Sequence, residues 1–136
     1  MNIQHYHHDH AHIYEQINLL RNLSRSGVRE NAPQISELIT GTASRIKFHL
    51  AAEERVLYPT LADAGDSRVA TLGARYQKEM QGLAGAFTDF VNQWRVPSRL
   101  AADPDGFRRD ANTVLRALFE RLKREEVELY PVAETI

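Results

Sequence analysis

Two stretches of the sequence, HLAAEERVLYP at residues 49–59 and RLKREEVELYP at residues 121–131, share most of their pattern. Both contain Leu at the second position, a Glu-Glu pair and a closing Leu-Tyr-Pro. The offset of 121 − 49 = 72 residues is close to half of the 136-residue chain. The sequence therefore predicts two related halves that end in the same motif.

Glycine and proline divide the chain into four segments with helical periodicity. Apolar residues recur every three or four positions, and no window alternates with the period of a strand. The predicted helices span approximately residues 7–26, 33–64, 66–94 and 104–130. Mostly short connections favour antiparallel neighbours. We therefore expect a single all-α domain over residues 1–136, an antiparallel four-helix up-down bundle built from two pseudo-repeated helical hairpins.

Particular residues predict where these helices begin and end. Asp66 suits an N-cap, and Asp103 followed by Pro104 suits a cap and a first helical position. Pro59 is expected to kink or end the second helix, because proline has no backbone N–H to donate. Residues 95–104 are expected to form the longest connection.

The overall composition excludes several classes of function. The sequence has no cysteine, which excludes disulfides, iron–sulfur clusters and thiol catalysis. Any metal must use His, Asp, Glu or Tyr, which favours iron, manganese or zinc. A net charge of −1 gives no field that favours nucleic acid or an anionic membrane. No apolar stretch approaches the ~20 residues of a membrane span, and Met1 is not followed by a signal peptide. We expect a cytoplasmic protein.

Polar side chains interrupt the apolar face of the second predicted helix. Continuing that face through Ile46 leads to His49 and Glu53, which are four residues apart and lie on one side of a helix. An uncompensated polar group in a core costs roughly 2–7 kcal/mol. In the fourth helix, Arg121 and Glu125 occupy the corresponding positions. A metal ion would satisfy imidazole and carboxylate together, and a polar network without metal is the alternative.

Five histidines lie between residues 5 and 12. His10 falls on the apolar face, one turn before Ile13, and is the predicted inward-facing ligand. His7, one turn earlier, is a fallback ligand. The remaining three are expected to be solvated and to bind nickel or zinc only adventitiously: His5, His8 and His12.

DHAHI at residues 9–13 and HLAAEERVLYP at residues 49–59 resemble the hemerythrin-like HHE cation-binding family. The resemblance covers essentially the whole chain. It implies that His10, His49 and Glu53 are metal ligands. In this family the ligands hold a non-haem di-iron centre bridged by two glutamates. Such a centre binds or reduces dioxygen, handles nitric oxide or peroxide, or senses redox state.

The second half departs from the family pattern. Met80 stands where the third helix should supply a histidine, and Arg121 replaces the histidine of the fourth. A thioether is a poor ligand for iron, and arginine stays protonated. Tyr76 and Glu79 are the fallback ligands nearby, although the favoured interpretation of Tyr76 is a core aromatic with its hydroxyl hydrogen-bonded. Glu125 alone survives from the second metal's ligand set.

A charge argument predicts how many metal ions bind. A guanidinium about 4 Å from a divalent ion, at an effective dielectric of ~20, is repelled by roughly 8 kcal/mol. We therefore expect at most one ion, held by His10, His49 and Glu53. Glu125 would bridge to it or pair with Arg121.

The favoured function is the sensing or handling of a small diatomic or peroxide ligand, such as O2 or nitric oxide, by a mononuclear iron-type site. A homodimer is compatible with this prediction. One alternative is a metal-free interaction or regulatory module, in which exposed Phe87, Phe90 and Trp94 would form a partner surface. Another is a mononuclear iron or manganese enzyme, which needs a substrate cleft.

Overall fold

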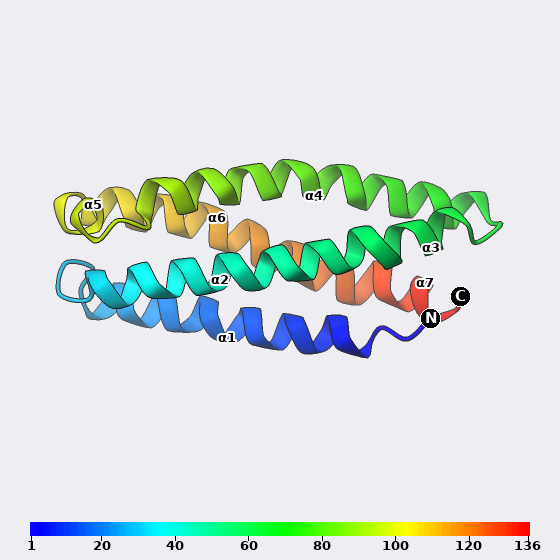
Figure 1. Cartoon of the computed structure of the whole chain (residues 1–136), viewed down its shortest axis with the longest axis horizontal. Coiled ribbons are helices and arrows are strands. Elements are labelled where there is room, and N and C mark those ends of the chain that lie inside the picture. The colour runs from blue at the N-terminus through cyan, green and yellow to red at the C-terminus, as the bar shows by residue number, and fades with distance from the viewer.

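The structure, a computed structural model, describes residues 1–136 and is helical throughout with no strand. Four long helices lie side by side along the molecule, and both chain termini lie at one end of it (Figure 1). These helices are α1 (Gln4–Ser26), α2 (Ala32–Ala52), α4 (Ser67–Trp94) and α6 (Pro104–Arg124). The prediction of an all-α fold is confirmed.

Two of the long helices continue through a wide π turn into a short helix. The π segment η1 (Glu53–Leu57) joins α2 to α3 (Tyr58–Ala62). Likewise, η2 (Glu125–Leu129) joins α6 to α7 (Tyr130–Glu134). Pro59 therefore does not end the helix, contrary to one of the two outcomes expected. Because proline lacks an N–H and its ring crowds the carbonyl four residues earlier, a wider turn just before it is a natural accommodation.

The π turns change which side chains share a face. Five residues of an α-helix correspond to a rotation of about 500°, so residues i and i+5 point about 140° apart. In the π segments, the N–H of Tyr58 bonds to the carbonyl of Glu53, and the N–H of Tyr130 bonds to that of Glu125. This i to i+5 pattern brings each tyrosine closer to the side of its own glutamate. The two copies of the sequence motif therefore adopt the same local backbone geometry.

The first helix begins earlier than predicted, at Gln4 rather than near residue 7. The side-chain Oδ1 of Asn2 accepts the N–H of Gln4 at 3.0 Å, which satisfies one of the free donors at the helix start. All five N-terminal histidines are therefore helical, and their directions are set by the turn of α1.

A short helix that the sequence did not predict, α5 (Pro97–Ala102), lies within the expected connection 95–104. Pro97 supplies a favoured first helical residue, and Leu100 is fully buried. The predicted caps are present: Asp66 accepts from the N–H of Arg68, and Asp103 accepts from that of Gly106, both at 2.9 Å.

The apolar core consists of two clusters. The larger has 17 buried residues, including Ile13, Ile46 and Leu122, and the smaller has 9, including Tyr6 and Leu57. Where the two clusters adjoin along the helices lie all of the buried His, Glu and Arg residues, here called the polar layer: His10, His49, Glu53, Arg121 and Glu125. The chain therefore buries a set of ionisable groups between two apolar regions.

Phe87, Phe90 and Trp94 belong to the larger cluster and are at most 6% exposed. The indole N–H of Trp94 donates to Oδ2 of Asp110 at 2.9 Å. The hypothesis that these three aromatics form an exposed partner surface is therefore wrong. They lie on the face of α4 that must cover the core next to Phe107.

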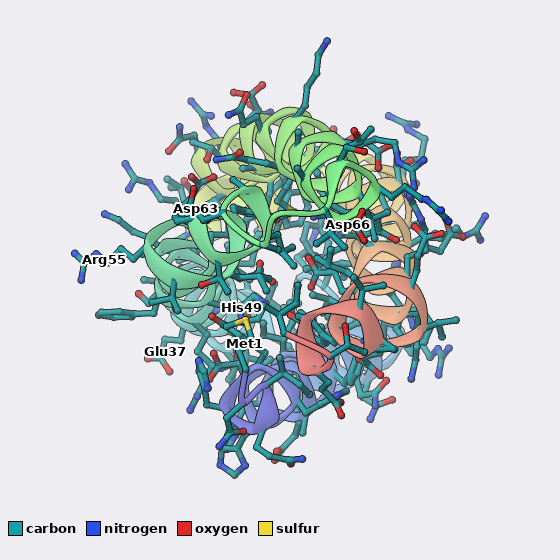
Figure 2. All side chains as sticks on the ribbon, turned by 90° about the vertical axis from the view of Figure 1, so that its right-hand side faces the viewer. Met1, Glu37, His49, Arg55, Asp63 and Asp66 are labelled. Carbon is teal, nitrogen blue, oxygen red and sulfur yellow. The ribbon has the colours of Figure 1, made fainter.

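The outer surface of the molecule is covered by charged side chains. Viewed along the molecule, Arg55 and Glu37 extend outward, whereas His49 lies on the inner side of its helix (Figure 2). None of the helices combines the length and the apolar character required to cross a membrane.

We predict that Phe107→Ala lowers the free energy of unfolding by about 3–5 kcal/mol, because it removes a fully buried ring from the larger cluster. Phe48→Ala is the matched control, since Phe48 is 78% exposed, and should change stability by less than about 0.5 kcal/mol. Urea denaturation followed by circular dichroism measures both. Equal effects of the two substitutions would contradict this assignment of the core.

Candidate metal centre

Two buried histidines from neighbouring helices direct the same ring nitrogen toward one place. Nε2 of His10, on α1, lies 3.2 Å from Nε2 of His49, on α2. Oε1 of Glu125 lies 2.9 Å from the first nitrogen and 3.7 Å from the second. Oε1 of Glu53 lies 3.4 Å from Nε2 of His49. Three separate parts of the chain thus bring together the four residues predicted as the main ligands.

The outward-facing nitrogen of each histidine is held by a carboxylate. Nδ1 of His10 lies 2.7 Å from Oε2 of Glu126, and Nδ1 of His49 lies 3.1 Å from Oδ2 of Asp9. The hydroxyl of Tyr14 also donates to Glu126. Carboxylates in this position fix the tautomer and orientation of metal-binding histidines and leave Nε2 free to face inward. Sequence reasoning missed these carboxylates, although each directly adjoins a predicted ligand in the chain.

Tyr130 is the central residue that sequence reasoning missed. Its buried hydroxyl oxygen lies 3.0 Å from Nε2 of His10 and 3.3 Å from Nε2 of His49. The same oxygen lies 2.9 Å from Oε2 of Glu53 and 3.0 Å from Oε1 of Glu125. A hydroxyl has one hydrogen to donate, so these four neighbours compete for it. The signal for Tyr130 was present in the repeated Leu-Tyr-Pro.

Arg121 occupies the other side of Glu125. Its Nε donates to Oε2 of Glu125 at 2.9 Å, and its Nη2 donates to the hydroxyl of Tyr58 at 3.0 Å. The guanidinium lies over the ring of Tyr76, with its carbon 4.5 Å from the ring centroid. Arg121 is only 4% exposed, so its charge is desolvated and paired chiefly with Glu125. A fixed cation therefore stands beside the predicted ligand set.

The two halves of the site are related by the sequence repeat. Tyr130 contacts His49 at 3.3 Å, and the equivalent Tyr58 contacts Arg121 at 3.0 Å. His49 and Arg121 are themselves equivalent positions of the repeat. The pseudo-symmetry therefore places the guanidinium where the second half would otherwise present an imidazole.

The fallback ligands do not join this cluster. Tyr76 is buried, but its hydroxyl donates to Oε1 of Glu128 at 2.6 Å. Glu79 is partly exposed and pairs with Arg124 at 3.2 Å. Met80 is buried at the third-helix position and offers only a thioether. The ring of His7 packs edge-on against the ring of Tyr130, at 5.4 Å between centroids, rather than pointing a nitrogen into the cluster.

Burial and charge shift the pKa values of the polar layer in opposite directions. Burial, followed by the charge of Glu125, raises the pKa of Glu53 to about 8. Burial also raises the pKa of Glu125, but the hydrogen bond with His10, the nearby His49 and the charge of Arg121 outweigh it and hold that pKa far below its usual range.

Burial lowers the pKa of His49, yet the nearby carboxylates of Glu125 and Glu53 prevail and raise it to about 9. Burial raises the pKa of Tyr130 far above the usual phenol value, so its hydroxyl stays neutral. The raised pKa values favour protons on Glu53 and His49, and the charge of Arg121 offsets that of Glu125. A bound cation would take the place of those protons.

The residues present fit a metal ion. His10, His49 and Glu125 each offer a ligand atom within 4.8 Å of the other two, and all three are buried. Oε1 of Glu53 is buried and has no hydrogen-bond partner, so it remains available as a further ligand. Imidazole nitrogens combined with carboxylate oxygens suit iron, manganese or zinc.

Comparison with known proteins agrees with this arrangement. A family model described as the hemerythrin HHE cation-binding domain matches residues 1–133. No curated protein and no solved structure gives a match. The family match covers nearly the whole chain, so this protein belongs to the hemerythrin HHE cation-binding family.

Proposed function

We propose that this protein holds a single metal ion, iron in preference to manganese or zinc, among His10, His49, Glu53 and Glu125. The observation that carries the proposal is the convergence of both Nε2 atoms on Oε1 of Glu125, with both Nδ1 atoms held by carboxylates. Histidines whose outer ring nitrogen is bonded to a carboxylate are typical of metal sites. We also propose that the four long helices form an antiparallel up-down bundle of two pseudo-repeated hairpins. The short helix α5 lies in the connection between α4 and α6.

The charge of Arg121 supports one ion rather than two. A second ion sharing Glu125 would sit on the side of Oε2, where Nε of Arg121 already lies at 2.9 Å. At about 4 Å from that guanidinium, a divalent ion would be repelled by roughly 8 kcal/mol at an effective dielectric of ~20. The second half has no histidine at positions 80 and 121 to bind a second ion, and the thioether of Met80 is a poor ligand for iron. Arg121 thus acts as the second cation of the site.

The enclosure of the polar layer supports a small ligand. His10, Glu53 and Glu125 are at most 1% exposed, so an organic substrate has no open path to them. When bound, iron would supply a Lewis-acidic, redox-active centre suited to O2, nitric oxide or peroxide. The neutral hydroxyl of Tyr130 supplies a hydrogen-bond donor inside this dry site. We therefore propose sensing or handling of such a ligand.

The second candidate is a metal-free regulatory module that retains the buried network. The position of Tyr130 favours it, because its hydroxyl already contacts all four proposed ligands at 2.9–3.3 Å. A buried hydrogen-bonded network can stabilise a unique core without a metal, and here only Oε1 of Glu53 and Nη1 of Arg121 lack a partner among its carboxylate and guanidinium atoms. Measurement of metal content separates the two candidates.

We predict about one equivalent of iron, manganese or zinc in protein purified without chelators or an affinity metal, because the charge of Arg121 disfavours a second ion. His49→Ala should remove most of it, since Nε2 of His49 is a proposed ligand. His8→Ala is the matched control and should leave the content unchanged, because His8 is exposed. Elemental analysis gives the readout. Metal-free wild-type protein, or equal loss in both variants, would favour the second candidate.

A second prediction concerns the number of ions. Arg121→His combined with Met80→His should raise the metal content toward two equivalents, because it removes the repelling charge and restores two imidazoles. Arg116→His combined with Met80→His is the matched control, since Arg116 is exposed on the same helix. Elemental analysis and iron spectroscopy follow the change. If the first double variant holds no more metal than the control, the charge argument fails.

A further inference from the structure

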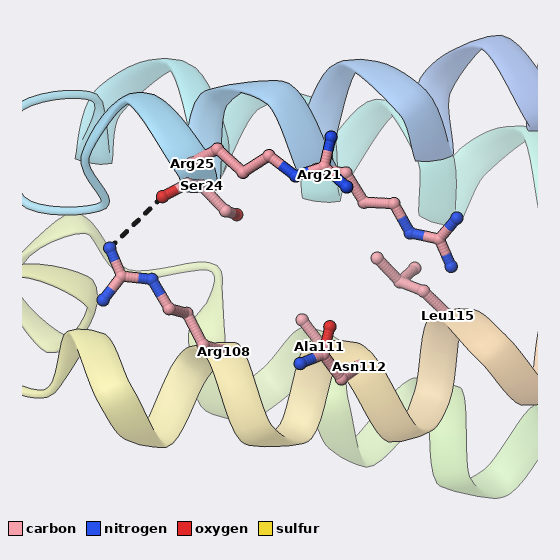
Figure 3. A pocket seen from close by; sticks show the side chains of 7 residues that line it. All are labelled: Arg21, Ser24, Arg25, Arg108, Ala111, Asn112 and Leu115. Carbon is pink, nitrogen blue, oxygen red and sulfur yellow. Dashed lines mark hydrogen bonds between the residues drawn. The ribbon is translucent and has the colours of Figure 1, made fainter.

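A pocket lined by arginines lies between α1 and α6, toward the end of the molecule that carries α5 (Figure 3). Its volume is about 240 Å³. Arg21 and Arg25 line it from α1, and Arg108 and Asn112 line it from α6. It shares no residue with the polar layer. It is therefore a separate feature of the protein.

The pocket is strongly positive in a nearly neutral protein. No carboxylate lines it, and Arg21 and Arg25 form no ion pair at all. The one acidic partner of Arg108 is Asp105, which is 89% exposed and lies 3.3 Å away. The chain as a whole carries a net charge of −1. The positive charge of the pocket therefore comes from the local arrangement of arginines and not from a basic chain.

The two arginines of α1 are spaced so that they repel each other. Arg21 and Arg25 are four residues apart, and like charges at this spacing destabilise a helix. Arg25 lies in the last turn of α1, where the helix dipole favours a cation, but Arg21 lies a full turn earlier. The dipole thus offsets only part of the repulsion. An anion held between them would remove it.

The third arginine is held in place across the groove. Nη2 of Arg108 donates to the backbone carbonyl of Ser24 at 3.2 Å, as the dashed line in Figure 3 shows. The floor of the pocket is apolar, because Ala111 and Leu115 are buried. The hydrogen bond to Ser24 orients Arg108, whose side chain is still 43% exposed and can reach a ligand.

We propose that this pocket binds a diphosphate group. Each guanidinium can donate two parallel hydrogen bonds to a phosphoryl group, and three positive charges in one pocket favour a multiply charged anion over a halide or a single carboxylate. A volume of about 240 Å³ leaves room for two linked phosphoryl groups. The group comes either as inorganic diphosphate or as the end of a nucleoside diphosphate. This site is independent of the metal proposed above.

Calorimetric titration of the full chain with inorganic diphosphate tests the proposal. Saturable one-to-one binding is expected, and Arg21→Gln and Arg25→Gln should each weaken it at least tenfold. Arg45→Gln is the matched control, because Arg45 is exposed on α2 and forms no ion pair. It should change the affinity less than twofold. Parallel titration with ADP shows which source is preferred. Metal content is measured before and after, since diphosphate also binds metal ions.

Thermal unfolding separates binding from a structural role of the arginines. Without diphosphate, Arg25→Gln should unfold at the same temperature as the wild type or higher, because it relieves repulsion. With diphosphate, only the wild type and the control should gain stability. The proposal is overturned if no saturable binding occurs, if Arg45→Gln weakens binding as much as Arg25→Gln, or if Arg25→Gln unfolds at a lower temperature and still binds normally.

Discussion

The structure depends on one constraint: five ionisable side chains are buried between two apolar clusters, and each must find a partner there. Removing a charge from water costs several kcal/mol unless a counter-charge and hydrogen bonds replace the solvent. Glu125 meets this need from two sides, with His10 at 2.9 Å and Arg121 at 2.9 Å. The positions of α1, α2 and α6 follow from this requirement, because none can shift without leaving a charge unpaired.

Under the proposal of a single metal ion, the repeat accounts for how Arg121 would stand in for a second cation without a change in packing. His49 and Arg121 occupy equivalent positions, and each contacts the tyrosine contributed by the other half. An arginine is always positively charged, so its charge does not depend on the binding of a metal ion. Arg121 therefore places a positive charge beside Glu125, where the proposal has no second metal ion. Such a site keeps the fold of the family and differs from it in what it can hold.

Much of this could be predicted from the sequence, and the failures have physical causes. The apolar periodicity and the burial of His10, His49 and Glu53 followed from helical spacing alone. The continuation of the helix past Pro59 could not be predicted in this way, because a π turn depends on how the following segment packs. Tyr130 was overlooked for the same reason: an α-helix would point it away from Glu125, and only the wide turn directs its hydroxyl inward. The aromatic face of Phe87 was also ambiguous, since periodicity shows a stripe but not what covers it.

The most direct test of the central claim is anomalous diffraction from crystals of the natively purified protein, collected at the absorption edge of the metal found in it. The account predicts one anomalous peak, within bonding distance of Nε2 of His10 and His49, with the guanidinium of Arg121 still paired to Glu125. Two peaks, or a metal on the Arg121 side of Glu125, would contradict it. So would a crystal with no peak, in which the hydroxyl of Tyr130 alone joins the two imidazoles.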